Sequence, residues 1–402
     1  MRIGLIITVD RYTLLPYINC EKDRDTVTRN CRPIGAPSVN ALIHSFLKAG
    51  HFIRIFMLAK QAFIVKTPQL EIFAAQSYDR YPAKYIIGSF KDTKSLRQLM
   101  HDNISDLDVL HAHWTYENAY SALPYAQQMP VFCSVRDIAS YIWRIETPKN
   151  KITWTFKVLM NHIVLTNKHI HFIANSPYTA AVIKKKFGKD LPVIPNSIKD
   201  SFIKHGSHIP PKNFRILCIS SSNDRRKNII SLLCAYRMFK SAHHGTTLQL
   251  VGAPFTDSSK AVRQWAKAGL LDGVELVGLV THDGLTTYID QCSVFVTPSL
   301  EETFGNTLLE AIVRKVPVIG GEKSGAVPYV LLHGRAGYLC DVSSPKSISE
   351  TLDYVFQHQN ETKLKTEKAY NIILNRYNEK TVCDKHIRLY EKYMTHTNHT
   401  HE

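Results

Sequence analysis

The sequence predicts an α/β protein made of two doubly wound domains. Arg2 to Val9 is a continuous apolar run, the pattern of a strand buried on both faces of a parallel sheet. A second strand of this kind, Arg215 to Ile219, follows the polar stretch Lys204 to Asn213, which contains two consecutive prolines. The chain has 402 residues, enough for two domains of ordinary size that each bury a core.

These landmarks set the expected domain boundaries. We expect a first domain over residues 1–203, a linker over 204–213, a second domain over 214–376, a C-terminal helix over 377–394 and a disordered tail over 395–402. Within the first domain, the polar segment Arg11 to Arg32 has no clear periodicity. It is therefore predicted to be an irregular loop.

Composition excludes several classes of protein. Hydrophobic residues at 44% and charged residues at 21% are globular values, which argues against wholesale disorder. No apolar run approaches the roughly 18 residues of a membrane span, and Arg2 to Val9 is too short for a signal peptide core. The eight cysteines include no C-x-x-C pair and are expected to be reduced and structural. We expect a cytoplasmic protein.

Positive charge is concentrated in the first half of the chain. The net charge is +16, and residues 1–204 hold 27 Lys and Arg against 15 Asp and Glu, a net of +12. Such an excess suits nucleic acid, an anionic membrane or an anionic substrate. No basic stripe interleaved with aromatics is present, so nucleic acid is not expected as a partner.

One segment of the first half suits a membrane surface. Trp143 and Trp154 lie among Arg144, Lys149, Lys151 and Lys157 on helical spacing, as in a helix that lies at a bilayer interface. An ordinary amphipathic helix packed on the sheet would show the same pattern. Both interpretations stay open, and a peripheral placement on an anionic membrane is one expectation.

The segment 294–319 carries the most chemical information. A short β-branched strand, Val294 to Thr297, is followed by a loop, a helix from Asn306 to Arg314 and another buried strand. Backbone N–H groups at such a loop and helix start bind phosphate, and Gly305 permits close approach. Glu302 and Glu310 suit sugar hydroxyls instead. A nucleotide sugar has both parts, whereas a plain surface helix start with dipole-stabilising glutamates is the alternative.

The same segment resembles a known enzyme family. Pro298-Ser299-x-x-Glu302-x-Phe304-Gly305, then Glu310-Ala311 and Pro317-Val318-Ile319, is similar to the E-x7-E motif of the retaining glycosyltransferases of family four. That resemblance implies the GT-B fold, in which two Rossmann-like domains face each other across a cleft. It also implies that Glu310 binds the ribose and Glu302 the sugar ring, while Phe304, Gly305, Asn306 and Thr307 bind the donor.

A basic cluster opens the second domain. Arg225-Arg226-Lys227 stands at a helix start, where the helix dipole disfavours cations unless an anion is bound. A solvated charge run is the alternative. In the resembling family an Arg and a Lys hold the pyrophosphate here, and Lys227 matches the Lys. Ser221 stands at the Arg position, so Arg225 or Arg226 is expected to replace that contact.

The first domain supplies further candidates. Gly35 and Ala36 form a turn before a helix, a second candidate phosphate cradle that covers the donor diphosphate in the resembling family. His111 and His113 share one face of a strand, which suggests either a metal site or a strand end that lines a cleft; we expect the latter and no metal. Arg136 stands where the family often has histidine, and it can pair with phosphate.

Together these features predict a metal-independent glycosyltransferase. It would move a hexose-type sugar, with retention, from a nucleotide diphosphate sugar to a hydroxyl of a glycan or lipid-linked acceptor. Glu302, Lys227, Arg136 and His113 are the expected catalytic residues, and no cofactor beyond the donor is expected. The alternatives are a nucleotide-sugar epimerase of the same fold and a non-catalytic module that binds sugar or membrane.

Overall fold

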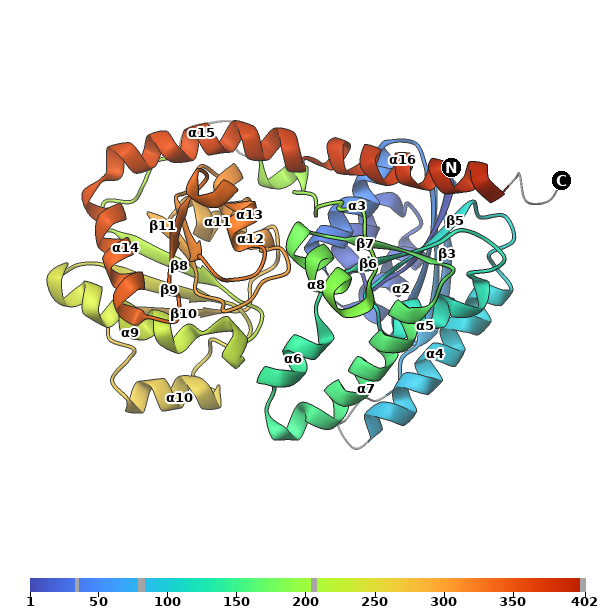
Figure 1. Cartoon of the computed structure of the whole chain (residues 1–402), viewed down its shortest axis with the longest axis horizontal. Coiled ribbons are helices and arrows are strands. Elements are labelled where there is room, and N and C mark those ends of the chain that lie inside the picture. The colour runs from blue at the N-terminus through green and yellow to red at the C-terminus, as the bar shows by residue number, and fades with distance from the viewer. Residues whose placement is uncertain (33–35, 79–83, 204–207, 398–402) are drawn as a thin grey trace. The chain divides into compact units, whose positions relative to one another are not determined.

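The chain forms two compact units. The computed structural model describes residues 1–32, 36–78, 84–203 and 208–397, and Figure 1 traces their course. The first unit comprises residues 1–197 and the helix Glu379–Thr397, and the second comprises Ile198–Asn378. Each unit is built on one sheet with helices packed against it, which confirms the predicted pair of Rossmann-like domains.

The sheet of the first unit has seven strands in the order β3-β4-β2-β1-β5-β6-β7. All neighbours are parallel except the edge strand β3, which runs antiparallel to β4. The order turns back between β1 and β5, so the carboxyl ends of these strands border a topological switch point. The strands are β1 (Arg2–Ile6), β2 (Phe52–Ala59), β3 (Phe63–Lys66), β4 (Leu70–Gln76), β5 (Val109–His113), β6 (Val131–Val135) and β7 (Ile170–Ala174).

The described helices of the first unit lie between these strands in the chain or follow the last of them. They are α1 (Arg11–Leu14), η1 (Leu15–Tyr17), α2 (Glu21–Asn30), α3 (Pro37–Lys48), α4 (Tyr85–His101), α5 (Glu117–Ala122), η3 (Leu123–Tyr125), α6 (Ala139–Ile145), α7 (Pro148–Thr166), α8 (Pro177–Phe187) and α16 (Glu379–Thr397), where η denotes a 3-10 helix.

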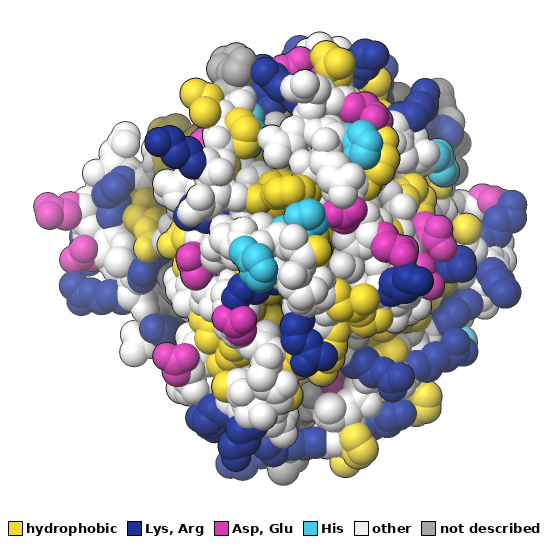
Figure 2. All heavy atoms as spheres, turned by 90° about the vertical axis from the view of Figure 1, so that its left-hand side faces the viewer, with side chains coloured by type: hydrophobic (Ala, Val, Ile, Leu, Met, Phe, Trp, Pro, Cys, Tyr) yellow, Lys and Arg dark blue, Asp and Glu magenta, His cyan; other side chains and the backbone are white. Residues whose placement is uncertain are grey.

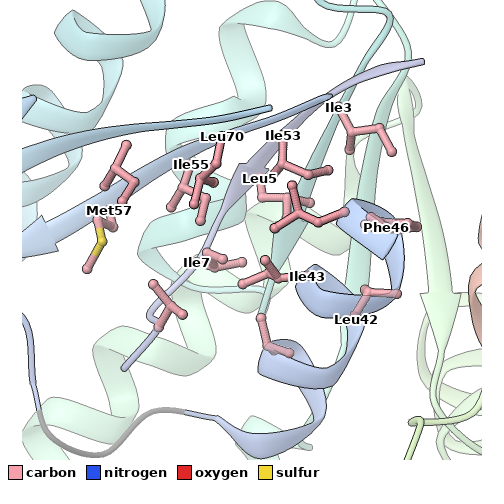
Figure 3. Packing of buried hydrophobic residues seen from close by; sticks show 14 of the residues in the cluster. Ile3, Leu5, Ile7, Leu42, Ile43, Phe46, Ile53, Ile55, Met57 and Leu70 are labelled. Atoms are coloured by element: carbon pink, nitrogen blue, oxygen red, sulfur yellow. The ribbon is translucent and has the colours of Figure 1, made fainter. Parts of the chain in front are cut away.

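Figure 3 shows the core between α3 and the sheet. Alternate residues of β1 and β2 point toward α3. From one face of this helix, Leu42, Ile43 and Phe46 pack against them. The helix is apolar along this face because these positions recur at helical spacing. Burial of such side chains contributes about 1.5–3 kcal/mol each, so this packing holds the start of α3 close to the end of β1.

Helix α16 completes the first unit from the far end of the sequence. Its His386 and Tyr390 pack on Phe46 of α3, with ring centroids 6.1 and 6.2 Å apart. The Tyr390 hydroxyl also lies 2.6 Å from His111 Nδ1 on β5. The helix extends to Thr397, so residues 395–397, predicted to belong to a disordered tail, are helical; the other residues of that prediction, 398–402, lie outside the described part.

The expected irregular loop over Arg11 to Arg32 is wrong, because α1, η1 and α2 occupy most of it. Only Val27 of α2 is buried, so the helix has no apolar stripe that a periodicity search could find. Local polar contacts replace it. Arg24 donates to the carbonyl oxygens of Leu15 and Ile18, and Arg29 pairs with Asp25 one turn away.

The sheet of the second unit has six strands, all parallel, in the order β10-β9-β8-β11-β12-β13. The order turns back between β8 and β11, which makes a second switch point. The elements are η4 (Asp200–Phe202), β8 (Arg215–Ile219), η5 (Arg225–Lys227), α9 (Ile229–Ala242), β9 (Thr247–Val251), α10 (Lys260–Lys267), β10 (Val274–Gly278), α11 (Leu285–Asp290), β11 (Val294–Thr297), α12 (Asn306–Val313), β12 (Val318–Gly321), α13 (Val327–Val330), η6 (Leu332–Gly334), β13 (Tyr338–Cys340), α14 (Pro345–Gln357) and α15 (Gln359–Tyr377).

The boundary between the units falls at Ser197, before the predicted end of the first domain at residue 203. Ile198 donates its N–H to the Tyr377 carbonyl oxygen at 2.8 Å, and Phe202 is buried in the core of the second unit. These contacts draw residues 198–203 into the second unit. Of the predicted linker, residues 204–207 lie outside the described residues, and 208–213 belong to the second unit.

Figure 2 shows one face of the molecule, viewed from the side where Figure 1 draws α14 and α9, on which Lys and Arg alternate with Asp and Glu and with hydrophobic side chains. Among the described residues, no helix combines the length and apolarity that crossing a bilayer requires.

Replacing Phe46 by Ala is expected to lower the free energy of unfolding by about 3–5 kcal/mol, because the deletion leaves a cavity between α3, the sheet and α16. Phe90 on α4 is half exposed, and Phe90→Ala serves as the matched control with an expected loss of about 1 kcal/mol or less. Urea unfolding of both variants measures the difference. Equal losses would contradict the packing described here.

Candidate functional site

The two loops that border the switch point of the second unit are joined by hydrogen bonds. Leu300 N, after β11, donates to Arg226 O, after β8, at 2.8 Å. The Asn228 side-chain amide donates to Pro298 O at 3.1 Å and to Val342 O at 2.7 Å. The predicted basic cluster and the predicted glutamate loop are therefore brought together, although about 75 residues separate them in sequence.

Gly305 begins α12 in a conformation that only glycine adopts readily. Its φ is +93°, and a Cβ there would lie 3.2 Å from Leu308 Cδ1. Asn306 and Thr307 form the first turn of α12, and buried Phe304 packs on Tyr377 at 5.7 Å between ring centroids. The helix start predicted as a phosphate cradle is thus present, with its loop anchored to the core.

Lys227 and Glu302 form the central ion pair of this site. Lys227 Nζ lies 2.6 Å from Glu302 Oε1, and both side chains are largely buried. Burial raises the pKa of Glu302, but the charges of Lys227 and Arg226 and hydrogen bonds from Lys227 and Ser299 outweigh it, so the pKa lies below its ordinary value. Glu302 is therefore an anion at neutral pH, and Lys227 is held beside it.

The two arginines of the cluster have different surroundings. Arg226 is partly buried, with its guanidinium 4.0 Å from Glu301 Oε2 and 4.0 Å from Asp224 Oδ2. Arg225 is exposed, as is Ser221 at the position where the resembling family has its arginine. Of the two predicted substitutes, Arg226 is the one placed between the loops.

Glu310 has a partner that sequence reasoning missed. His282 Nε2 lies 2.9 Å from Glu310 Oε1, and the His282 ring stacks on Phe202 with centroids 4.4 Å apart. Burial lowers the pKa of His282, but the charge and hydrogen bond of Glu310 outweigh it, so the pKa lies above its ordinary value. The loop after β10 thus meets the first turns of α12 through this contact.

In the first unit, Arg136 is the centre of the candidate residues. Its Nε donates to His113 Nδ1 at 2.9 Å, and its Nη1 donates to Ser38 Oγ at 2.9 Å and Asn196 Oδ1 at 2.6 Å. Burial lowers its pKa to about 10, which leaves it charged at neutral pH. His113 ends β5, Arg136 follows β6 and Ser38 lies in the first turn of α3, so these three residues gather near the switch point of the first sheet; Asn196 joins them from the segment after α8.

The other predicted residues of the first unit have the following positions. Ala36 is the N-cap of α3, whereas Gly35 lies outside the described residues. His113 has no exposed surface, and its ring accepts the hydrogen bond from Arg136. His111 Nδ1 lies 2.6 Å from the Tyr390 hydroxyl, and Nε2 lies 2.9 Å from Ser134 Oγ. Within the described ranges, no group of three or more His, Cys, Asp or Glu is arranged to hold a metal.

The His282–Glu310 contact predicts a pH-dependent contribution to stability. Because the folded pKa is raised, the contribution is complete below the unfolded pKa of about 6.5 and is lost as pH rises through the folded value. Wild type should exceed His282→Gln in free energy of unfolding by about 1–2 kcal/mol near pH 6, and by less near pH 8.5. Glu310→Gln should abolish the pH dependence of this difference; a difference independent of pH would contradict the pairing.

Two family models match the chain one after the other. Residues 36–202 match the model described as Glycosyltransferase Family 4, and residues 200–372 match the model described as Glycosyl transferases group 1. The phosphatidylinositol N-acetylglucosaminyltransferase gpi3 subunit of Schizosaccharomyces pombe is 24% identical over 242 residues, which are 60% of this chain and 50% of the relative. The chain thus spans about half the length of that curated relative.

Solved structures show the same fold. Sucrose-phosphate synthase from Thermosynechococcus elongatus has a TM-score of 0.77 at 16% identity, with 98% of this chain and 99% of that chain covered. Anabaena HepE in complex with UDP and glucose has a TM-score of 0.68 at 16% identity, with 98% and 100% covered. Residues 36–202 therefore resemble a Family 4 glycosyltransferase domain and residues 200–372 a group 1 glycosyltransferase domain, and the two units together have the GT-B fold.

Proposed function

We propose that this protein transfers a hexose-type sugar, with retention, from a nucleotide diphosphate sugar to a hydroxyl of a glycan or lipid-linked acceptor. The observation that carries the proposal is the joined pair of loops in the second unit, where Lys227 and Glu302 meet beside Gly305. Cations, carboxylates and a helix start within one site match a ligand with both phosphate and polyol parts. HepE was solved with UDP and glucose, and the gpi3 relative is named for transfer of N-acetylglucosamine.

In this proposal Lys227 stabilises the diphosphate leaving group. As the glycosidic bond breaks, negative charge grows on the diphosphate, and prearranged cations and N–H groups stabilise it. Lys227 and Arg226, with the amides at the start of α12, would take this role without a metal ion. When Lys227 turns to the diphosphate, Glu302 becomes free to accept hydrogen bonds from the transferred sugar.

The remaining residues would orient the donor. Glu310 has one oxygen on His282 and keeps further acceptor capacity for ribose hydroxyls. Arg136, oriented by His113, Ser38 and Asn196, offers a fixed cation for a phosphate or another anionic group of a substrate. In this assignment His113 is a positioning residue and Arg136 contacts the substrate.

Activity of Lys227→Ala tests the proposal. Radiolabelled UDP-sugars and GDP-sugars are incubated with the protein and a membrane-lipid extract, and labelled glycan or lipid product is measured. Turnover should fall at least about 100-fold in Lys227→Ala, because the variant loses stabilisation of the leaving group. Lys323→Ala, at an exposed position after β12, is the matched control and should remain active.

Three outcomes separate the proposal from its rivals. Labelled product that requires an acceptor supports transfer. Free labelled sugar without an acceptor would indicate an epimerase, and binding of nucleotide sugar without any product would indicate a non-catalytic module. A loss of activity below fivefold in Lys227→Ala would contradict the proposed role of Lys227 at the leaving group and leave it a structural partner of Glu302.

Because a lipid-linked acceptor would lie at a membrane, we also propose that the first unit docks on an anionic bilayer. Exposed apolar residues form a stripe on α7, namely Ile152, Leu159 and Ile163, and another on α4, namely Ile86, Ile87 and Phe90. The helices run side by side in Figure 1, and Phe90 packs on Phe156 at 5.4 Å between ring centroids. We call these two stripes the α4–α7 surface.

Lysines accompany this surface, and one of the two predicted indoles is exposed. Lys91 and Lys94 are exposed on α4, and Lys149 is exposed on α7. Trp143 is exposed, with the Lys151 ammonium 4.3 Å from its ring centroid, whereas Trp154 packs edge-on against Tyr116 at 6.0 Å. Aliphatic side chains flanked by cations suit an anionic bilayer.

Vesicle sedimentation tests the membrane proposal. The protein should bind anionic phosphatidylglycerol vesicles at low salt and bind neutral vesicles much less, because each cation near an anionic bilayer contributes about 1 kcal/mol. Added salt should release it, since the Debye length is about 8 Å at physiological ionic strength. Ile152→Glu with Leu159→Glu should abolish binding, whereas Ile64→Glu on β3 should not. Equal binding to both vesicle types at low salt would exclude the proposal.

A further inference from the structure

A cavity of about 390 Å³ lies within the second unit, away from the joined loops. Phe214, Ser293 and Pro317 line it, and each immediately precedes a strand, namely β8, β11 and β12. These strands are neighbours and parallel, so the cavity lies at their amino ends. Lys227, Glu302 and the start of α12 follow the carboxyl ends, about 16 Å away for a five-residue strand. We call this space the basal cavity.

Apolar rings form one part of the wall of the basal cavity. Phe214 and Phe356 meet edge to face with ring centroids 5.1 Å apart, and both line the cavity. Pro210, Pro211 and Pro317 add further ring surfaces. Such walls favour a planar apolar ligand, because aromatic rings stack on proline and phenylalanine with large contact area. Pockets of about 300–1,000 Å³ with this character hold small organic molecules.

Positive charge converges on the cavity from three separate segments. Lys212, Lys315 and Lys363 line it, and Glu367 is the one carboxylate among its described lining residues. Lys212 and Lys363 are exposed at the rim. An excess of two positive charges beside apolar walls attracts an anionic group and orients it toward the rim.

Lys315 is constrained more strongly than a solvated surface lysine. Its φ is +61°, in the left-handed region where side chains other than glycine are uncommon. Its ammonium lies 4.8 Å from the centroid of the Tyr370 ring, a cation–π contact. Its N–H donates to Ile312 O at 2.8 Å, which holds this backbone conformation at the end of α12. These two contacts restrict the position of the Lys315 backbone and ammonium group at the cavity wall.

From the apolar rings, the volume and the three lysines, we propose that the basal cavity binds a small aromatic anion. Its ring system would lie between the phenylalanine and proline walls, and its carboxylate, sulfonate or phosphate would meet the lysines. The site is separate from the proposed donor site, so it adds a second ligand to the proposed function and does not depend on it.

Titration with 1-anilinonaphthalene-8-sulfonate tests the proposal, because this planar aromatic sulfonate fluoresces in apolar surroundings. We expect saturable binding of one dye per folded chain. Lys212→Glu with Lys363→Glu should weaken binding at least about tenfold, since two charge-assisted contacts become repulsive. Lys368→Glu makes the same charge change at an exposed position of α15 outside the lining and should leave the affinity unchanged.

Two further measurements locate the dye. Asn360→Trp narrows the cavity without changing its charge and should also weaken binding of the dye. Lys227→Ala should leave binding unchanged, because Lys227 follows the carboxyl end of β8 and the cavity lies at the amino end of that strand. Neutral N-phenyl-1-naphthylamine should bind with an affinity that the lysine substitutions do not alter. The proposal is overturned if the double lysine variant binds the sulfonate as tightly as wild type, or if Lys227→Ala abolishes binding.

Discussion

The side-chain amide of Asn228 connects the three loops on which the candidate donor site depends. Asn228 itself follows β8, and it donates to carbonyl oxygens that follow β11 and β13. Its backbone is left-handed, with φ of +53°, a conformation that asparagine tolerates better than most residues. Removing the amide would leave two backbone acceptors without this donor and loosen the loops that carry Lys227 and Glu302. The neutral side chain of Asn228 thus helps to hold the loops of Lys227 and Glu302 close together.

Much of this arrangement follows from local sequence, and some of it does not. The strands at the start of each unit and at β11 are apolar runs between breakers, and α12 was expected within one residue of its observed end. These elements form because their apolar side chains become buried, and the spacing of apolar residues in the sequence indicates that burial. Helix α2 escaped detection because it buries a single side chain, Val27, and is held by arginine contacts instead.

The contacts of the candidate site depend on distant parts of the chain. Arg136 meets Ser38 and Asn196, which are 98 and 60 residues away, and His282 meets Glu310 across 28 residues. The resemblance to a known family selected the candidate residues, but it did not predict these partners. The rotamer of His282 depends on stacking against Phe202, and no spacing rule in the sequence specifies that contact.

Buried histidines of the two units have pKa values shifted in opposite directions. In the second unit burial lowers the pKa of His282, but the Glu310 carboxylate outweighs it and the pKa is raised. In the first unit burial lowers the pKa of His111, His113 and, to about 3, His386, with neighbouring histidines and Arg136 adding to the effect. Protonation therefore opposes folding of the first unit as pH falls below the unfolded value of about 6.5. The helix α16 carries His386 into this cluster, so acid weakens the attachment of the same helix that completes the core.

The place of α16 in the sequence also affects how the protein is made. The second unit is continuous from Ile198 to Asn378, whereas the first is interrupted and needs residues from Glu379 onward. During synthesis, which proceeds from the N-terminus, the second unit can therefore close before the first has its final helix. Until then the surfaces of Phe46 and His111 that α16 covers face solvent. A nascent chain would spend that interval with an apolar face open to chaperones or to association with other chains.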